Sequence, residues 1–192
     1  VLYSRTLSIL LPLAIEQAYE RNYEPLVAMA GFFEEMGMSV GMTFSVLCSE
    51  DVAHLARHQI PRSTGEDGRF SPTLFDSFYD VCEFWPRGEI PDDYFDPTES
   101  DVPVLLISGA LDPVTPPEWG EAAAKHLSRS RHLVVPGVGH GTLNYGCLPD
   151  IVAQFIEQAD AEGIDDSCIY ELRRPPFFYS TAGPVAAATS DD

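Results

Sequence analysis

Residues 102–141 decide the fold, and they read VPVLLISGALDPVTPPEWGEAAAKHLSRSRHLVVPGVGHG. Two short apolar runs, 104–108 and 132–135, are typical of strands that are buried on both faces of a parallel sheet. Between them, residues 116–127 have apolar positions at helical spacing, and residues 151–161 show a second helical pattern. The order strand, helix, strand, helix predicts an α/β fold with a doubly wound sheet.

Two parallel strands do not close a hydrophobic core of their own, so this stretch needs more sheet than the chain supplies. We therefore expect the chain to be the C-terminal part of a larger fold. Before the strands, helical patterns cover residues 4–19, 23–36 and 72–84, and residues 42–48 have the pattern of an extended run. Residues 86–103 carry four prolines and many acidic residues, which is typical of a linker.

The composition argues against two kinds of partner. The chain has 192 residues, enough for one ordinary domain, and a net charge of −19 from 11 Lys and Arg against 30 Asp and Glu. This charge repels phosphate backbones and anionic lipids, so we expect no nucleic acid and no membrane as partner. The longest apolar run, 7–15, is too short to span a bilayer and no signal-peptide cleavage site follows it. Any export signal is therefore expected upstream of Val1.

The cysteines bear on the redox environment. There are four, Cys48, Cys82, Cys147 and Cys168, and no two have the spacing of a metal-binding CxxC pair. Four cysteines allow three pairings, which the sequence alone does not distinguish. Pairing of neighbours along the chain would close two loops, each worth about 3–4 kcal/mol. The alternative is four buried free thiols in a cytosolic protein, whereas disulfides would indicate an oxidising compartment.

A candidate acid and a candidate base follow the two predicted strands. Asp112 lies just past the first, in SGALDPVTP at 108–116, and His140 lies just past the second, in PGVGHG at 136–141. Loops at the carboxyl ends of neighbouring parallel strands meet at one site. There the histidine would take a proton from a nucleophile, and the carboxylate would hold its tautomer and stabilise the imidazolium. Either residue alone is equally well explained as a turn acid or a loop histidine, but the pair predicts two members of a catalytic triad.

These two loops, SGALDPVTPP at 108–117 and PGVGHG at 136–141, resemble the acid and base loops of α/β-hydrolases. More narrowly, the chain resembles the tripeptidyl-aminopeptidase-like branch, near the proline iminopeptidases. The resemblance is strongest over residues 103–178. Further segments that fit this branch are CSED at 48–51, Cys82 ahead of Trp85 and Pro86, Cys147, Cys168, and RPPF at 174–177.

The resemblance implies a division of the chain. Residues 101–178 would be the C-terminal part of a hydrolase core, namely its last two parallel strands with flanking helices, and would carry the triad acid and base. Residues 1–100 would form a mainly helical lid, and residues 179–192 a tail. The earlier strands, the oxyanion loop and the nucleophile would lie in an N-terminal half outside this chain. The implied disulfides are Cys48–Cys82 and Cys147–Cys168.

One serine inside the chain matches a nucleophile motif. Ser39 lies in GMSVG at 37–41, and the order Ser39, Asp112, His140 is that of the hydrolases. A nucleophile elbow, however, requires a strand before the serine and a helix after it. Here a helical pattern precedes the serine and an extended pattern follows it, so we reject Ser39 and interpret the glycines as a helix stop and a turn.

Two acidic residues, Glu50 and Asp51, are candidates for binding substrate. In enzymes of the type that the chain resembles, lid carboxylates can bind the free α-amino group of a peptide. The alternative is that Glu50 and Asp51 stand at a helix N-terminus, where acidic side chains are favourable.

The acid–base pair predicts a serine hydrolase with Asp112 and His140 as catalytic residues. The family resemblance implies an exo-acting peptidase of the tripeptidyl or prolyl aminopeptidase type as the activity. The expected partners are a short peptide or small acyl substrate and the N-terminal half of the same hydrolase, and no metal or organic cofactor is implied. One alternative is an esterase on the same fold. Another is a non-catalytic fragment or binding module, because half a triad should not turn over. The expected location is secreted or periplasmic.

Overall fold

The computed structural model describes residues 5–34, 39–55 and 73–184. Within these residues, no helix is long and apolar enough to cross a bilayer. The elements in chain order are α1 (Arg5–Tyr19), α2 (Glu24–Glu34), α3 (Val40–Val46), the π-helix η1 (Leu47–Asp51), α4 (Thr73–Cys82), β1 (Val104–Gly109), α5 (Pro117–Ala124), β2 (Ser130–Val135), the 3-10 helix η3 (Thr142–Asn144), α6 (Leu148–Gln158) and the 3-10 helix η4 (Ser167–Glu171).

The chain divides into two compact units. Unit 1 comprises Val1–Glu35 and Pro97–Asp192, and unit 2 comprises Met36–Asp96. The predicted division into a lid at 1–100, a part of the hydrolase core at 101–178 and a tail at 179–192 describes functional regions, which need not coincide with compact units. This division stays a prediction.

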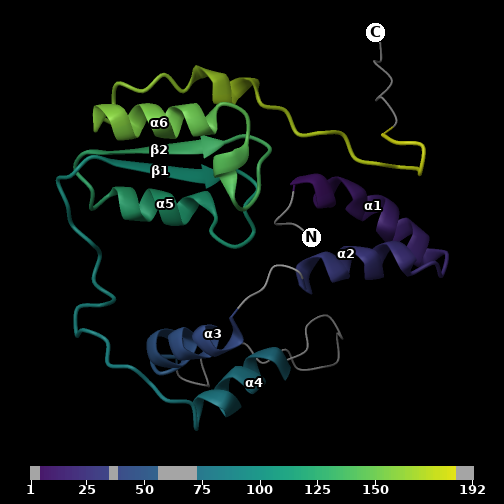
Figure 1. The fold of residues 1–192 in the computed structure, drawn as a ribbon, viewed down its shortest axis with the longest axis horizontal. Helices are drawn as coiled ribbons and strands as arrows, with labels where there is room; N and C mark the ends of the chain where they lie inside the picture. Colours follow the sequence, from purple (N-terminus) through teal and green to yellow (C-terminus); the bar gives the residue numbers. More distant parts are fainter. Residues whose placement is uncertain (1–4, 35–38, 56–72, 185–192) are drawn as a thin grey trace. The chain divides into compact units, whose positions relative to one another are not determined.

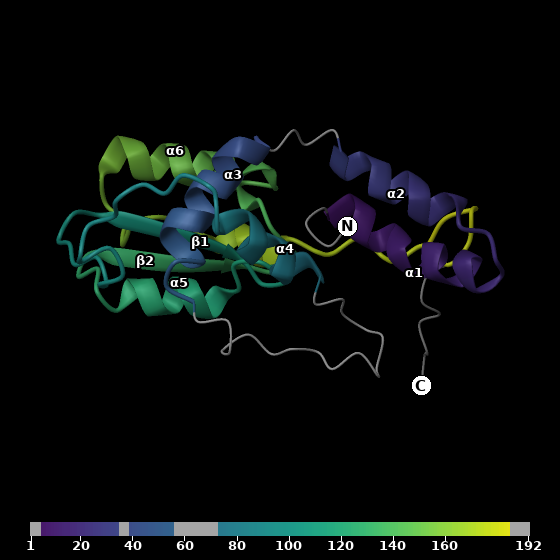
Figure 2. The same ribbon diagram turned by 90° about the horizontal axis from the view of Figure 1, so that it is seen from below.

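The centre of unit 1 is a parallel sheet of two strands. β1 and β2 pair in register from Val104 opposite Ser130 to Gly109 opposite Val135. α5 lies on one face of this sheet and α6 on the other, as both views of the ribbon show (Figures 1 and 2). The predicted alternation of strands and helices, with a parallel sheet between helical layers, is therefore confirmed.

β1 differs from the prediction in its burial. Residues 104–108 are half-buried, although their sequence is typical of a strand buried on both faces. The cause is the size of the sheet, because in the described part of the chain β1 pairs with β2 along one edge and has no third strand on the other.

The hydrophobic core of unit 1 lies between the sheet and α6. Val135, Val138, Leu148 and Ile169 are completely buried there, and Leu133, Ile151 and Ile164 are nearly so. Arg131 of β2 fastens the segment after α6 to the sheet. Its guanidinium group donates a hydrogen bond of 2.6 Å to the carbonyl oxygen of Ile164 and pairs with Asp166 at 2.8 Å.

Most helices lie where the sequence predicts them. The expected helices at 4–19, 23–36 and 72–84 correspond to α1, α2 and α4. α6 begins at Leu148, three residues before the predicted start at residue 151. Pro149 lies in its first turn, where the missing N–H of proline costs the helix nothing.

The prediction of an extended run at 42–48 is wrong, because these residues lie in α3 and η1. Hydroxyl side chains there bond to carbonyl groups one turn back: Thr43 Oγ1 donates to Ser39 O at 3.1 Å, and Ser45 Oγ to Gly41 O at 3.0 Å. The helix also packs through Phe44, whose ring lies 5.4 Å from that of Trp85. Tertiary packing thus outweighs the strand propensity of the β-branched and aromatic residues.

Two disulfides are present, Cys48–Cys82 in unit 2 and Cys147–Cys168 in unit 1. They are the two pairs that the family resemblance implies. Cys48 and Cys82 are buried and join η1 to the end of α4. Cys147 and Cys168 join the start of α6 to η4, across the core of unit 1.

We predict that each disulfide stabilises its own unit. The loops span 21 residues for Cys147–Cys168 and 34 for Cys48–Cys82, so loop-closure entropy predicts losses of about 3 and about 4 kcal/mol when both cysteines of a pair are changed to serine. The two tryptophans, Trp119 in unit 1 and Trp85 in unit 2, allow urea unfolding of each unit to be followed by fluorescence, with the other tryptophan replaced by phenylalanine. A loss below about 1 kcal/mol for either pair would contradict the prediction.

Candidate active site

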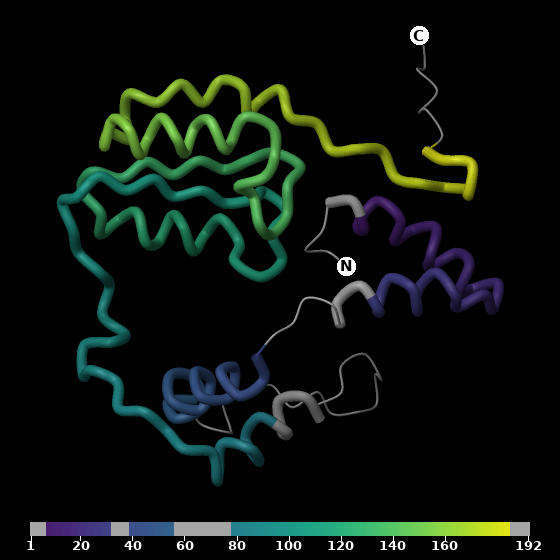
Figure 3. Tube along the Cα trace, viewed as in Figure 1, coloured from purple at the N-terminus to yellow at the C-terminus, as the bar shows by residue number. Residues whose placement is uncertain are grey.

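The loops that follow β1 and β2 lie at the same end of the sheet (Figure 3). Three main-chain hydrogen bonds hold the first loop: Ala110 N–H donates to Val135 O at 3.0 Å, Leu111 N–H to Val138 O at 2.9 Å, and Asp112 N–H to Gly109 O at 3.1 Å. One of these bonds reaches the end of β2 and another reaches the second loop, so the backbone fixes the distance between the loops.

Gly109, the last residue of β1, permits this close approach. A Cβ atom at Gly109 would fall inside contact distance of Gly139 O and 2.6 Å from Val138 O. The other loop uses a glycine for its conformation, since Gly141 has φ +78°, in the left-handed region. Gly109 lies three residues before Asp112, and Gly141 directly follows His140, so both glycines shape the loops that carry the candidate acid and base.

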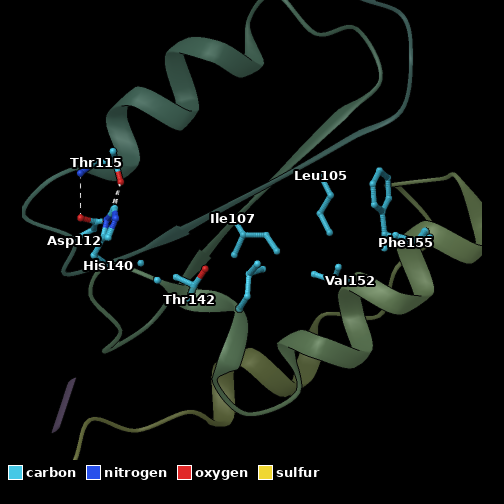
Figure 4. Close-up of a pocket in the computed structure, with 12 residues that line it drawn as sticks. Leu105, Ile107, Asp112, Thr115, His140, Thr142, Val152 and Phe155 are labelled. Atoms are coloured by element: carbon cyan, nitrogen blue, oxygen red, sulfur yellow. Dashed lines mark hydrogen bonds and ion pairs between the residues drawn. The ribbon is translucent and has the colours of Figure 1, made fainter. Parts of the chain in front are cut away.

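The structure brings the two candidate residues together. Oδ2 of Asp112 lies 2.9 Å from Nδ1 of His140 (Figure 4). The Asp112 side chain is only 5% exposed, whereas the His140 side chain is 39% exposed. The carboxylate is thus enclosed, while the imidazole remains open to a reacting group.

Hydrogen bonds keep the enclosed carboxyl group ionised. Burial by itself raises the pKa of Asp112. The main-chain N–H groups of Thr115 and Val114, the hydroxyl group of Thr115 and the imidazole of His140 together outweigh burial and lower the pKa to about 2. At neutral pH the carboxylate therefore only accepts hydrogen bonds. It follows that Nδ1 of His140 donates the proton of the bond between them, which leaves the lone pair on Nε2.

Thr115 also belongs to the site, although the sequence patterns above did not point to it. Oδ1 of Asp112 accepts from Val114 N–H at 2.8 Å and from Thr115 N–H at 3.0 Å, and Oδ2 accepts from Thr115 Oγ1 at 2.8 Å. The spacing of DPVT at 112–115 offers the signal. Aspartate often accepts hydrogen bonds from the main chain two and three residues later, and a threonine at the third position adds its hydroxyl group.

A groove of about 550 Å³ starts at this pair. Figure 4 shows Asp112, Thr115 and His140 at one end of it, and Leu105 of β1 with Phe155 of α6 at the other. The walls beyond the polar end are mostly apolar and come mainly from β1 and α6.

Glu50 and Asp51, the predicted substrate-binding residues, lie in η1 of unit 2. Glu50 accepts a hydrogen bond from the hydroxyl group of Tyr94. This bond raises the pKa of Tyr94, with smaller contributions from burial and from the charges of Glu50 and Asp51. The role of the two carboxylates in binding substrate stays a prediction.

The described residues around Ser39 do not have the order strand, serine, helix that a nucleophile elbow requires. The element before Ser39 is the helix α2, and the backbone of Ser39 has φ −70° and ψ 98°, an unstrained extended conformation. A helix, α3, does follow Ser39, contrary to the extended run that we predicted. Among the described residues no strand precedes Ser39, whereas a nucleophile elbow requires one.

The described residues contain no group of three or more His, Cys, Asp or Glu side chains that could hold a metal ion.

Comparison with known families assigns the chain to a class. A family model of the α/β-hydrolases, described as TAP-like protein, matches residues 67–168, more than half of the chain. The fold and this match define an α/β-hydrolase. More narrowly, the chain belongs to the TAP-like branch of that superfamily, as its sequence motifs suggested. No curated protein and no solved structure matches the chain.

We predict that Gly109→Ala disrupts the site and destabilises unit 1. The added methyl group would press on the carbonyl groups of Val138 and Gly139, which are backbone atoms that cannot move aside without separating the two loops. The expected loss is about 1–3 kcal/mol in the free energy of unfolding, measured by urea denaturation. Gly31→Ala is the control, because a Cβ at Gly31 in α2 meets nothing within 4 Å and should stabilise the helix slightly. Equal stabilities for the two variants would contradict the prediction.

We predict an acid-dependent contribution of Asp112 to stability. A carboxyl group whose pKa is lowered on folding stabilises the folded chain above its unfolded pKa and loses this effect as the pH falls through its folded pKa. For Asp112 the window runs from the usual 3.8 down to about 2, and the contribution is about 2 kcal/mol. The difference in unfolding free energy between the unmodified chain and Asp112→Asn should therefore shrink by that amount between pH 5 and pH 2. A difference that is independent of pH would contradict this assignment.

Proposed function

We propose that this chain supplies the acid and base of a serine hydrolase, with Asp112 as the acid and His140 as the base of a Ser-Asp-His triad. The observation that carries the proposal is the 2.9 Å contact between an enclosed carboxylate and a partly exposed imidazole at the mouth of a groove. Membership of a hydrolase family supports the same chemistry.

In the proposed mechanism, His140 acts first as general base. Its Nε2 takes the proton from the serine hydroxyl group while the serine oxygen attacks the carbonyl carbon of the substrate. Asp112 holds the imidazole by Nδ1 and stabilises the imidazolium that forms. The imidazolium then gives its proton to the leaving amine, and an acyl-enzyme remains. Water, activated by the same imidazole, hydrolyses the acyl-enzyme and regenerates the serine. These steps need no metal or organic cofactor.

The nucleophile is proposed to lie outside these 192 residues, in an N-terminal half of the same hydrolase that would be the main partner of the chain. Two observations support this. Ser39 follows a helix instead of a strand, and the half-buried strand β1 has room for further strands along its free edge in the described structure.

The proposed substrates are short peptides with a free N-terminus, as in the tripeptidyl and prolyl aminopeptidases that the sequence resembles. The proposal for this substrate class depends on Glu50 and Asp51, two adjacent carboxyl groups that suit a protonated α-amino group. The two disulfides favour an oxidising compartment, so we propose a secreted or periplasmic location.

We predict that His140→Gln and Asp112→Asn each lower kcat of the full-length protein on a peptide anilide by a factor on the order of 10³ to 10⁴. His140→Gln removes the base, and Asp112→Asn removes the carboxylate that sets its tautomer. His126→Gln is the matched control, because His126 is an exposed histidine after α5 and away from the site, and it should leave kcat unchanged. Equal activity of His140→Gln and the control would end the triad proposal.

Two further measurements separate the alternatives. If the full-length protein hydrolyses a short-chain nitrophenyl ester well but an aminoacyl anilide poorly, the enzyme is an esterase and the proposed peptidase activity is wrong. The 192-residue chain alone should not react with a fluorophosphonate probe, because its serines have no elbow context in the described structure. Labelling of Ser39 would show that the nucleophile lies within the chain.

A further inference from the structure

The hydroxyl group of Thr115 contacts both members of the candidate pair. Its Oγ1 lies 2.8 Å from Oδ2 of Asp112 and 3.3 Å from Nδ1 of His140, while Oδ2 and Nδ1 are 2.9 Å apart. The three atoms form a closed triangle, and Figure 4 shows Thr115 directly beside the pair. An ordinary turn threonine would contact the aspartate alone.

The available protons determine which atom donates and which accepts in each of the three contacts. The ionised carboxylate accepts only, so the single proton of the Thr115 hydroxyl group points to Oδ2. A lone pair of Oγ1 therefore faces Nδ1. Nδ1 thus meets two acceptors, Oδ2 and Oγ1, which favours the tautomer with the proton on Nδ1 and the lone pair on Nε2.

The same residue restrains rotation of the carboxylate. Its main-chain N–H, with that of Val114, holds Oδ1, and its hydroxyl group holds Oδ2. Rotation about the Cβ–Cγ bond of Asp112 would break bonds to both oxygens.

We propose that Thr115 is a positioning residue of the triad, whose hydroxyl group holds Oδ2 of Asp112 against Nδ1 of His140 and so orients the imidazole for proton transfer. The inference about catalysis rests on the proposed function. The contacts among the three side chains are independent of that function.

The ionisation of Asp112 agrees with this role. After burial, which raises the pKa, the hydrogen bonds of Thr115 and Val114 are the larger influences and that of His140 is the smallest. Among the described residues, the titratable group that faces the carboxylate is the imidazole of His140. The hydroxyl group of Thr115 lowers the pKa of Asp112, so its loss should raise that pKa.

The first test uses Thr115→Val and Thr115→Ser in the 192-residue chain. Valine has the shape of threonine without the hydroxyl group, serine keeps the hydroxyl group, and both keep the main-chain N–H. Thr115 is exposed, so neither change disturbs a core. Titration of the Asp112 carboxyl carbon by NMR should give a midpoint above that of the unmodified chain for Thr115→Val, and an unchanged midpoint for Thr115→Ser.

An unchanged midpoint in Thr115→Val would overturn the proposal, because the hydroxyl group would then have no hold on the carboxylate. Thr115→Ala is titrated in parallel and should shift in the same direction. It keeps the test decisive if the valine variant does not fold. Neither result depends on catalysis, so this arm stands even if the proposed function fails.

The second test measures hydrolysis by the full-length protein. Thr115→Val should lower kcat about tenfold, the effect of one hydrogen bond, with KM within about twofold, and Thr115→Ser should restore kcat. A purely structural role would lower activity through the amount of folded enzyme and would leave kcat per active site unchanged. Unchanged kcat in Thr115→Val overturns the positioning role. If the unmodified protein hydrolyses neither peptide nor ester, the proposed function fails instead.

Discussion

The parallel pairing of β1 with β2 is the constraint on which the site depends. Because Gly109 and Val135 end the two strands in register, the following loops start side by side. Main-chain hydrogen bonds then join the loops, and the missing side chain of Gly109 lets their backbones touch. The contact between Asp112 and His140 therefore depends on the backbone geometry of the two loops.

Enclosing a carboxylate is costly unless its hydrogen-bonding capacity is filled. Asp112 meets this condition with four donors, two on each oxygen. Three of the four belong to Val114 and Thr115, so the turn itself solvates the charge. The imidazole consequently does not have to be charged to keep the carboxylate in place, which suits a group that must gain and lose a proton.

The sequence predicted the strands, their helices and the neighbouring positions of Asp112 and His140, because each depends on local pattern. Apolar runs mark β1 and β2, and the position after each run marks Asp112 and His140. The misses have a different origin. Residues 42–48 have strand-like composition, but they are helical, and Phe44 packs against Trp85 in a tertiary contact that local composition does not reveal. The second contact of Thr115, with His140, joins residues 25 positions apart and has no local pattern.

The disulfide between Cys147 and Cys168 has a consequence for the integrity of the base loop. It encloses α6 and the segment that Arg131 fastens to β2 in a single covalent ring. A protease that cut the exposed chain between α6 and η4 would open this ring without releasing a fragment. The stretch carrying His140 would stay tethered to η4 through sulfur, and the nicked molecule would keep its mass, apart from one added water, until a reductant separated the pieces.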